Sequence, residues 1–296
     1  MTKPLSRFTQ KVIKKLDQYR TFFLDNMLLN PQDFSWKVRW RMRYDRNPVF
    51  IEIQDKYKVK LYAQSHGVRT AETYYVTDHP ESIPFDSLPE NYVIKATHGC
   101  GWNVFCKDGK LYLFEHDDPS SPTRTSLTQD DCIQLCHAWL KSTYSKKQWA
   151  YQHIVPQIVV EEQLHQHGGG ALIDYRFYTF DGKVEVIQFD SAIYRENESV
   201  FFNKNWQEIE LSIYRNRIPG PIPAKPENLQ EMINTAEKLG EGIDFVRVDL
   251  YNTTRGVVLG EMTIYPEAGM LNRPTVDKFF NNWLGDQWIL PESTYN

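Results

Sequence analysis

Apolar and polar residues alternate with a period of two in several short stretches of the chain, a pattern typical of β-strands. Asp-Gly pairs at 108–109 and 181–182 separate such stretches and predict tight hairpin turns. A longer pair near the C-terminus predicts another hairpin, with its turn at 252–256. The predicted strands and hairpins lie at 68–76, 89–114, 157–164, 173–190 and 245–266.

Apolar residues recur at three- and four-residue steps elsewhere, which predicts amphipathic helices. Residues 53–66 predict a helix that ends at Gly67, and residues 226–239 predict one closed by Gly240. Two more helices are predicted at 1–30 and 128–144. Because hairpins alternate with helices, we expect an α+β fold with mostly antiparallel sheets.

The predicted N-terminal helix carries five basic residues before its first acidic residue, Asp17. We interpret it as a packing helix with a solvated basic face, and contact with a membrane surface or an acidic partner is the alternative. No apolar run approaches the ~20 residues of a membrane span, and the N-terminus lacks an apolar stretch of signal-peptide type. We therefore expect a cytoplasmic protein, with peripheral contact at the inner face of the membrane as the alternative.

The composition is that of an ordinary globular protein, with 41% hydrophobic and 24% charged residues. This excludes disorder along the whole length and a collagen-like or coiled-coil architecture. The net charge of −4 predicts no general affinity for nucleic acid. The four cysteines match no zinc-ligand spacing, so we expect reduced thiols at Cys100, Cys106, Cys132 and Cys136.

Residues 36–46 alternate basic and apolar side chains, and we expect an extended stretch with its cations on one face. Two interpretations have equal weight. The cations hold an anionic acceptor or a phosphate, or they form a solvated edge while the apolar side chains pack inward. The cations of this stretch are Lys37, Arg39, Arg41 and Arg43; the last three, with Arg195, are the acceptor candidates.

A lysine and a glycine-rich loop lie together after one predicted strand. Lys95 ends the strand, and Gly99 and Gly101 let backbone N–H groups approach a phosphate. A lone lysine with this spacing is weak evidence, and an ordinary hairpin loop is the more frequent explanation.

An acid pair lies in the hairpin near the C-terminus. Asp249 and Glu261 flank its turn, so we expect their carboxylates on neighbouring strands at similar height. Facing carboxylates repel unless a cation bridges them, and Mg²⁺ prefers oxygen ligands. We favour this metal site over the alternative that one carboxylate faces solvent.

A third signal is the apolar strand that ends in Glu161-Glu162. Its backbone edge and a carboxylate are suited to adenine. Taken alone, however, such a strand more often simply meets solvent at its end.

Taken in order, these segments resemble the ATP-grasp superfamily, and within it the TupA-like branch of teichuronopeptide biosynthesis. The resemblance runs from about Trp36 to Gly269. It rests on "WRMRYDRNP", "QDKYKVKLYAQSHGV", "YVIKATHGCGWN", "VVEEQL", "DYRFYTFDGK" and "FVRVDLYN…GEMTIYPEAG". The ordered set of segments is more specific than any one of them.

The resemblance implies ATP held between two α+β subdomains. It implies that Lys56 and Lys95 bind phosphates and that residues 98–102 form a mobile loop above them. The implied domains are 1–50 (N-terminal helix and basic segment), 51–160 (lid subdomain) and 161–296 (subdomain with the metal site). The ATP-binding set it implies is Lys56, Lys95, His98, Gly99, Gly101, Glu161, Glu162, Leu164 and, for the ribose, Asp174.

The resemblance also implies one or two Mg²⁺ ions at Asp249 and Glu261. Thr263 stands where many superfamily members have Asn, which weakens the second ion site. Arg247 and Lys95 are the implied catalytic residues, with Arg247 stabilising either the transferring phosphoryl group or the oxyanion.

The implied activity is an ATP-dependent carboxylate–amine ligase that forms an acyl phosphate and releases ADP and phosphate. Its implied substrates are a small-molecule amine, such as an amino acid or peptide, and an acidic acceptor such as a cell-surface polysaccharide. A kinase of a small molecule or sugar with the same fold and a polysaccharide glycosyltransferase are the alternatives. A nucleotide-binding module without turnover is disfavoured by the intact acid pair.

Overall fold

The computed structural model describes residues 27–114, 124–167, 172–190, 200–209, 223–270 and 278–291. The predicted N-terminal helix lies almost wholly outside the described residues, and so does Arg195. Within the described part of the chain, no helix combines the length and the apolar character that a bilayer span requires.

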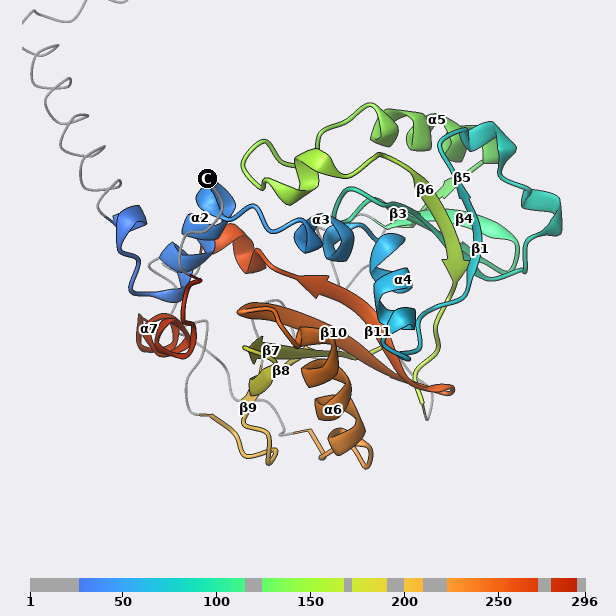
Figure 1. Cartoon of the computed structure of the whole chain (residues 1–296). Coiled ribbons are helices and arrows are strands. Elements are labelled where there is room, and N and C mark those ends of the chain that lie inside the picture. Colours follow the sequence, from blue (N-terminus) through green and yellow to red (C-terminus); the bar gives the residue numbers. More distant parts are fainter. Residues whose placement is uncertain are drawn as a thin grey trace, which may run out of the picture.

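Two antiparallel sheets form the frame of the protein (Figure 1). The six-stranded sheet has the order β1-β6-β2-β3-β4-β5, and the five-stranded sheet has the order β11-β10-β7-β8-β9. The strands of the first are β1 (Thr73–Thr77), β2 (Tyr92–Ala96), β3 (Asn103–Lys107), β4 (Lys110–Phe114), β5 (Arg124–Leu127) and β6 (Ile158–Glu162). Those of the second are β7 (Asp174–Phe180), β8 (Lys183–Asp190), β9 (Val200–Phe202), β10 (Phe245–Thr253) and β11 (Gly256–Thr263).

Helices pack on both sheets and also lie between them. Helix α5 packs on the six-stranded sheet and α6 on the five-stranded sheet, while α3 and α4 contact β11 (Figure 1). Helices α2 and α7 lie side by side. The helices are α2 (Phe34–Tyr44), α3 (Val49–Gln54), α4 (Lys58–Ser65), α5 (Gln129–Leu140), α6 (Leu229–Gly240) and α7 (Lys278–Gln287), with short 3₁₀ turns at Pro80–Ser82, Phe85–Ser87, Ala150–His153 and Pro266–Gly269.

The predicted α+β class with antiparallel sheets is confirmed, and each predicted strand region contains a strand. The two Asp-Gly turns adopt the left-handed backbone that tight hairpins need, with φ of 51° at Asp108 and 47° at Asp181. The hydrophobic core has two parts, one around the five-stranded sheet and one between the six-stranded sheet and α5.

The prediction of an extended stretch at 36–46 is wrong, because helix α2 covers Phe34–Tyr44. Asp33 caps the helix and accepts a hydrogen bond from the Trp36 N–H at 2.9 Å. In a helix, residues two apart point to opposite sides, so the four cations do not share a face. Lys37 Nζ donates to the carbonyls of Gly285 and Trp288, at the end of α7.

Arg41 lies fully buried in the core rather than on a binding surface. It donates to the Phe245 carbonyl at 2.7 Å, pairs with Asp244, and stacks 4.3 Å from the Trp288 ring centre. An acceptor cannot reach it, so Arg41 leaves the set of acceptor candidates.

The single helix predicted at 53–66 is broken at 55–57. The Asp55 carboxylate accepts from the N–H groups of Tyr57 and Lys58, so it caps the start of α4. The Lys56 N–H donates to the Thr97 carbonyl at 3.0 Å. The break therefore fixes Lys56 against the segment that leads from β2 into the glycine-rich loop.

Candidate nucleotide and metal site

A cavity of about 230 Å³ lies between the two sheets. Its walls come from the α3–α4 break, α4, both sheets and the glycine-rich loop. The lining residues are Lys56, Lys60, Ala71, Lys95, Cys100, Gly101, Asn103, Glu161, Leu164, Tyr251, Leu259, Gly260 and Glu261. The structure thus gathers into one cavity six of the residues predicted to bind ATP or metal: Lys56, Lys95, Gly101, Glu161, Leu164 and Glu261.

Glu161 lies between two lysines at the base of this cavity. Its carboxylate accepts from Lys60 Nζ at 2.5 Å through one oxygen and pairs with Lys95 through the other. Burial alone would raise the pKa of Glu161, but Lys95 and Lys60 lower it to about 2. The side chain predicted to read adenine is therefore an ionised bridge between two cations.

Both lysines that were predicted to bind phosphate line the cavity. Lys56 Nζ lies 4.0 Å from Glu261, and its side chain is 18% exposed. The Lys95 side chain is 29% exposed, so its ammonium group is open to a ligand although it pairs with Glu161.

The glycine-rich loop contributes Cys100 and Gly101 to the cavity. Gly101 has a φ of 74°, which favours glycine. Gly99 is covered by the indole of Trp102, because a Cβ there would lie 2.5 Å from the ring. Packing against Trp102 therefore explains why residue 99 is a glycine.

Asp249 and Glu261 are register partners on β10 and β11, as predicted. Arg247, from the same strand as Asp249, donates to both Asp249 oxygens at 2.8 and 2.6 Å and to Glu261 at 3.3 Å. The Thr263 hydroxyl donates to the same Glu261 oxygen at 3.3 Å. The four residues therefore form one hydrogen-bonded cluster at the cavity wall.

The two carboxyls of this cluster have different environments. Asp249 is buried, and burial raises its pKa to about 7 against the opposing charge of Arg247. Loss of solvent would also raise the pKa of Glu261, but Lys56 and Arg247 lower it to about 2. The Glu261 side chain is 42% exposed, so it is the carboxylate open to a ligand.

Some predicted residues point away from the cavity. His98 is buried, with Nε2 3.0 Å from the Trp139 carbonyl, and burial lowers its pKa. Glu162 pairs with Arg255 and accepts from the Glu72 N–H at 3.0 Å. The Glu162 N–H in turn donates to the Glu72 carbonyl at 2.9 Å, so both the side chain and the N–H of this residue have partners within the protein.

Three other candidates do not line the cavity. Asp174, at the start of β7, accepts from Arg176 at 3.1 Å. On α2, the Arg39 guanidinium lies 4.6 Å from the Trp36 ring centre, and Arg43 is exposed.

Sequence reasoning missed Lys60, Arg176 and Tyr251. Arg176 Nε lies 3.7 Å from Asp249 and is thus a second cation, beside Arg247, at this carboxyl group. The Tyr251 ring lines the cavity beside Gly260, where a Cβ would lie 2.5 Å from it. A glycine in an apolar strand was the available signal, since it marks a close approach.

The donor set at this wall fits Mg²⁺. Glu261 and Thr263 present oxygens toward one another, and a carboxylate such as Asp249 keeps free lone pairs after it accepts from one arginine. Among the described residues, no three His, Cys, Asp or Glu side chains gather as a metal cluster. Mg²⁺ usually takes one or two carboxylates together with substrate phosphates, and Asp249 and Glu261 supply two.

Two antiparallel sheets with a cavity between them, lined by Lys56, Lys95 and Glu261, are what the ATP-grasp class has. The model of the TupA-like ATPgrasp family matches residues 36–289. The chain belongs to this TupA-like ATP-grasp family.

Solved structures resemble the chain at a distance. D-alanine–D-alanine ligase from Bacillus anthracis, complexed with ATP, has 14% identity and a TM-score of 0.37 over 72% of this chain and 54% of that one. The corresponding ligase from Helicobacter pylori has 15% identity and a TM-score of 0.42 over 80% and 61%. N5-carboxyaminoimidazole synthetase from Staphylococcus aureus, complexed with ADP, has 10% identity and a TM-score of 0.40 over 72% and 45%. The chain spans about half of their lengths, and no curated protein matches it.

Proposed function

We propose that this protein is an ATP-dependent carboxylate–amine ligase. The observation that carries the proposal is the cavity itself, which Lys56 and Lys95 line together with Glu261, the exposed member of the acid pair. In the proposed reaction, a substrate carboxylate oxygen attacks the γ-phosphorus of ATP, and ADP leaves. The amine then attacks the carbonyl of the acyl phosphate, and phosphate leaves as the amide forms.

This chemistry needs no side-chain nucleophile, because the substrate carboxylate is the nucleophile. The chain supplies charge and alignment, as in other phosphoryl transfers. Lys56 and Lys95 offset charge on the phosphates, while residues 98–102 cover the nucleotide and keep water from the acyl phosphate. Arg247, fixed by Asp249, stabilises charge on the transferring group. Leu164, which follows β6 and lines the cavity, contacts adenine, and Asp174 binds the ribose.

Glu261, Asp249 and Thr263 are the residues that would hold Mg²⁺. When bound, the ion would neutralise part of the charge on the β- and γ-phosphates. Arg247 keeps the two carboxylates at fixed positions before any ligand arrives, since it donates to both.

For the substrates, we propose an amino acid or peptide as the amine and an acidic polysaccharide or related anion as the acceptor. Arg39 and Arg43 remain acceptor candidates, because both lie on α2 outside the core. The charges of these residues support the proposal, and saturation kinetics of the Arg39→Ala and Arg43→Ala variants test it. An unchanged acceptor KM in both variants would remove α2 from the acceptor site.

The activity is tested by incubating the full chain with Mg–ATP, pooled amino acids and an acidic oligosaccharide. The proposal expects ADP and phosphate that depend on both substrates, and loss of both products in Lys95→Ala and Glu261→Ala. Mass analysis of the acceptor must show an amide. A stable phosphoester formed without an amine would identify a kinase instead, and failure to bind ATP would reject the ATP-dependent activity.

A further inference from the structure

Lys60 is a third lysine in the cavity, and its surroundings differ from those of Lys56 and Lys95. Its side chain is only 7% exposed, whereas that of Lys95 is 29% exposed. Lys60 Nζ donates to Glu161 at 2.5 Å and to the Thr73 hydroxyl at 2.9 Å. Two acceptors and deep burial fix this ammonium group in place.

Glu161 needs a cationic partner, because a buried carboxylate is costly unless a cation accompanies it. One of its oxygens contacts Lys60 and the other contacts Lys95. If Lys95 turns toward a phosphate, Glu161 loses that partner and keeps Lys60. Without Lys60, the same movement would leave a buried anion alone.

We infer that Lys60 is a positioning residue whose fixed charge holds Glu161 and so releases Lys95 to bind the triphosphate of ATP. This inference rests on the proposed function. It assigns the three lysines different tasks: Lys56 and Lys95 contact phosphate, and Lys60 does not.

We expect the affinity for Mg–ATP to depend on the charge of Lys60. Replacing Lys60 by Met makes Lys95 the only counterion of Glu161, so Lys95 must leave a buried anion in order to reach ATP. The Kd for Mg–ATP then rises about tenfold or more, because breaking a buried ion pair carries a large penalty. Affinity for adenosine stays unchanged, since it has no phosphate for Lys95 to contact.

The double variant separates positioning from general damage. Lys60→Met together with Glu161→Gln removes the buried anion and its fixed partner, and Lys95 is free again. Affinity for Mg–ATP in the double variant should recover most of the loss seen in Lys60→Met. Non-additivity of this kind is expected only for residues that act through each other.

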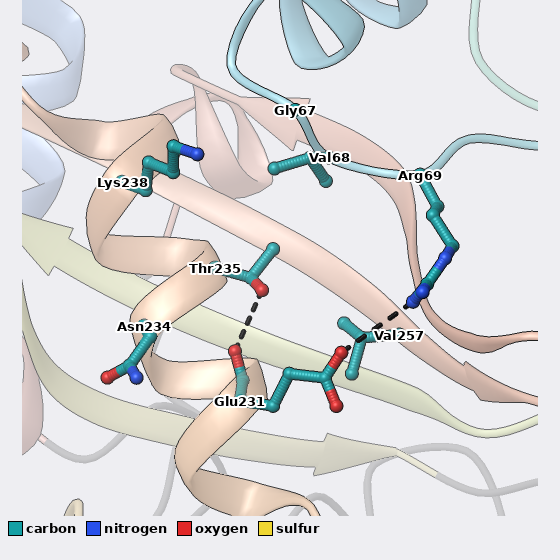
Figure 2. Close-up of a pocket in the computed structure, with 8 residues that line it drawn as sticks. All are labelled: Gly67, Val68, Arg69, Glu231, Asn234, Thr235, Lys238 and Val257. Atoms are coloured by element: carbon teal, nitrogen blue, oxygen red, sulfur yellow. Dashed lines mark hydrogen bonds and ion pairs between the residues drawn. The ribbon is translucent and has the colours of Figure 1, made fainter.

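Lys238→Met is the matched control. Figure 2 shows this lysine on α6, beside Gly67 in a different hollow, and its side chain is exposed. The same chemical change at Lys238 should leave the Kd for Mg–ATP unchanged. Lys60→Arg, which keeps the charge, should retain more affinity than Lys60→Met.

The experiment is calorimetric titration of the full chain and these variants with Mg–ATP and with adenosine, after thermal unfolding has shown that each variant is folded. If Lys60→Met does not fold, the double variant is compared with Lys60→Arg instead. The inference then requires that the double variant bind Mg–ATP at least as tightly as Lys60→Arg does. Equal Mg–ATP affinity in wild type and Lys60→Met overturns the inference about Lys60 but not the proposed function. The same holds if the double variant binds Mg–ATP no more tightly than Lys60→Met. Absence of Mg–ATP binding in the wild type overturns the proposed function as well.

Discussion

Replacing Glu161 by Gln tests the charge bridge at the base of the cavity. Two lysines lower the pKa of Glu161 from its usual 4.5 to about 2. At 1.36 kcal/mol for each tenfold change in proton affinity, this corresponds to ~3 kcal/mol of stabilisation by the ionised side chain. Gln keeps the shape and loses the charge, so we expect the free energy of unfolding at pH 7 to fall by about 3 kcal/mol.

The pH dependence follows from the sign of the shift. The folded-state pKa lies below the unfolded-state value, so the stabilisation is fully present above pH 4.5 and is lost as the pH falls toward 2. At pH 4 the unfolded chain already takes up protons at this position, and the gap between wild type and variant should be smaller by ~0.8 kcal/mol.

Urea unfolding followed by circular dichroism at pH 7 and pH 4 measures both quantities. Glu162→Gln is the control, because the neighbouring carboxylate pairs with Arg255, whose side chain is 46% exposed. Its loss should cost less than about 1 kcal/mol. A Glu161→Gln variant within 1 kcal/mol of wild type at pH 7, or a gap that does not narrow at pH 4, would refute the reasoning.

Three further variants or probes test other parts of the structure. Cys100 is exposed while the other three cysteines are buried, so Mg–ATP should slow alkylation of this thiol, as measured by intact mass; an unchanged rate contradicts nucleotide binding in the cavity. Arg41→Met should cost about 3 kcal/mol or more in urea unfolding and Arg43→Met less than about 0.5 kcal/mol, and equal costs would contradict the burial of Arg41. Gly99→Ala places a Cβ against the Trp102 ring and should destabilise the fold by about 1–3 kcal/mol, whereas a neutral result in the same assay would mean that the ring moves freely.

The hairpins were predictable because their signals are local. An Asp-Gly turn and the alternation around it determine which residues face each other, and the pairing of Asp249 with Glu261 across a longer turn could likewise be inferred from the sequence alone. The same locality explains the error at α2. Alternating basic and apolar residues resemble a strand, but Arg41 is stabilised in the core by partners such as Asp244, which lies more than 200 residues away in the sequence.

Lys60 was overlooked for a related reason. A lysine in a short polar helix is usually solvated, and nothing nearby in the sequence distinguishes it from Lys58. Its partner Glu161 lies on a distant strand, so only the folded chain brings the two together. Residues whose role depends on one remote partner are those that local patterns cannot reveal.

The position of β6 has a consequence for how the protein is made. This strand lies between β1 and β2, although it follows them in sequence by more than 60 residues. During synthesis the β2–β3–β4 meander can form as soon as it leaves the ribosome, but β1 has no neighbour to pair with until residue 162 has emerged. Because β6 also carries Glu161, the strand that completes the sheet brings the counterion that Lys60 and Lys95 lack until then. Completion of the sheet therefore also brings Glu161 between the two lysines that neutralise it.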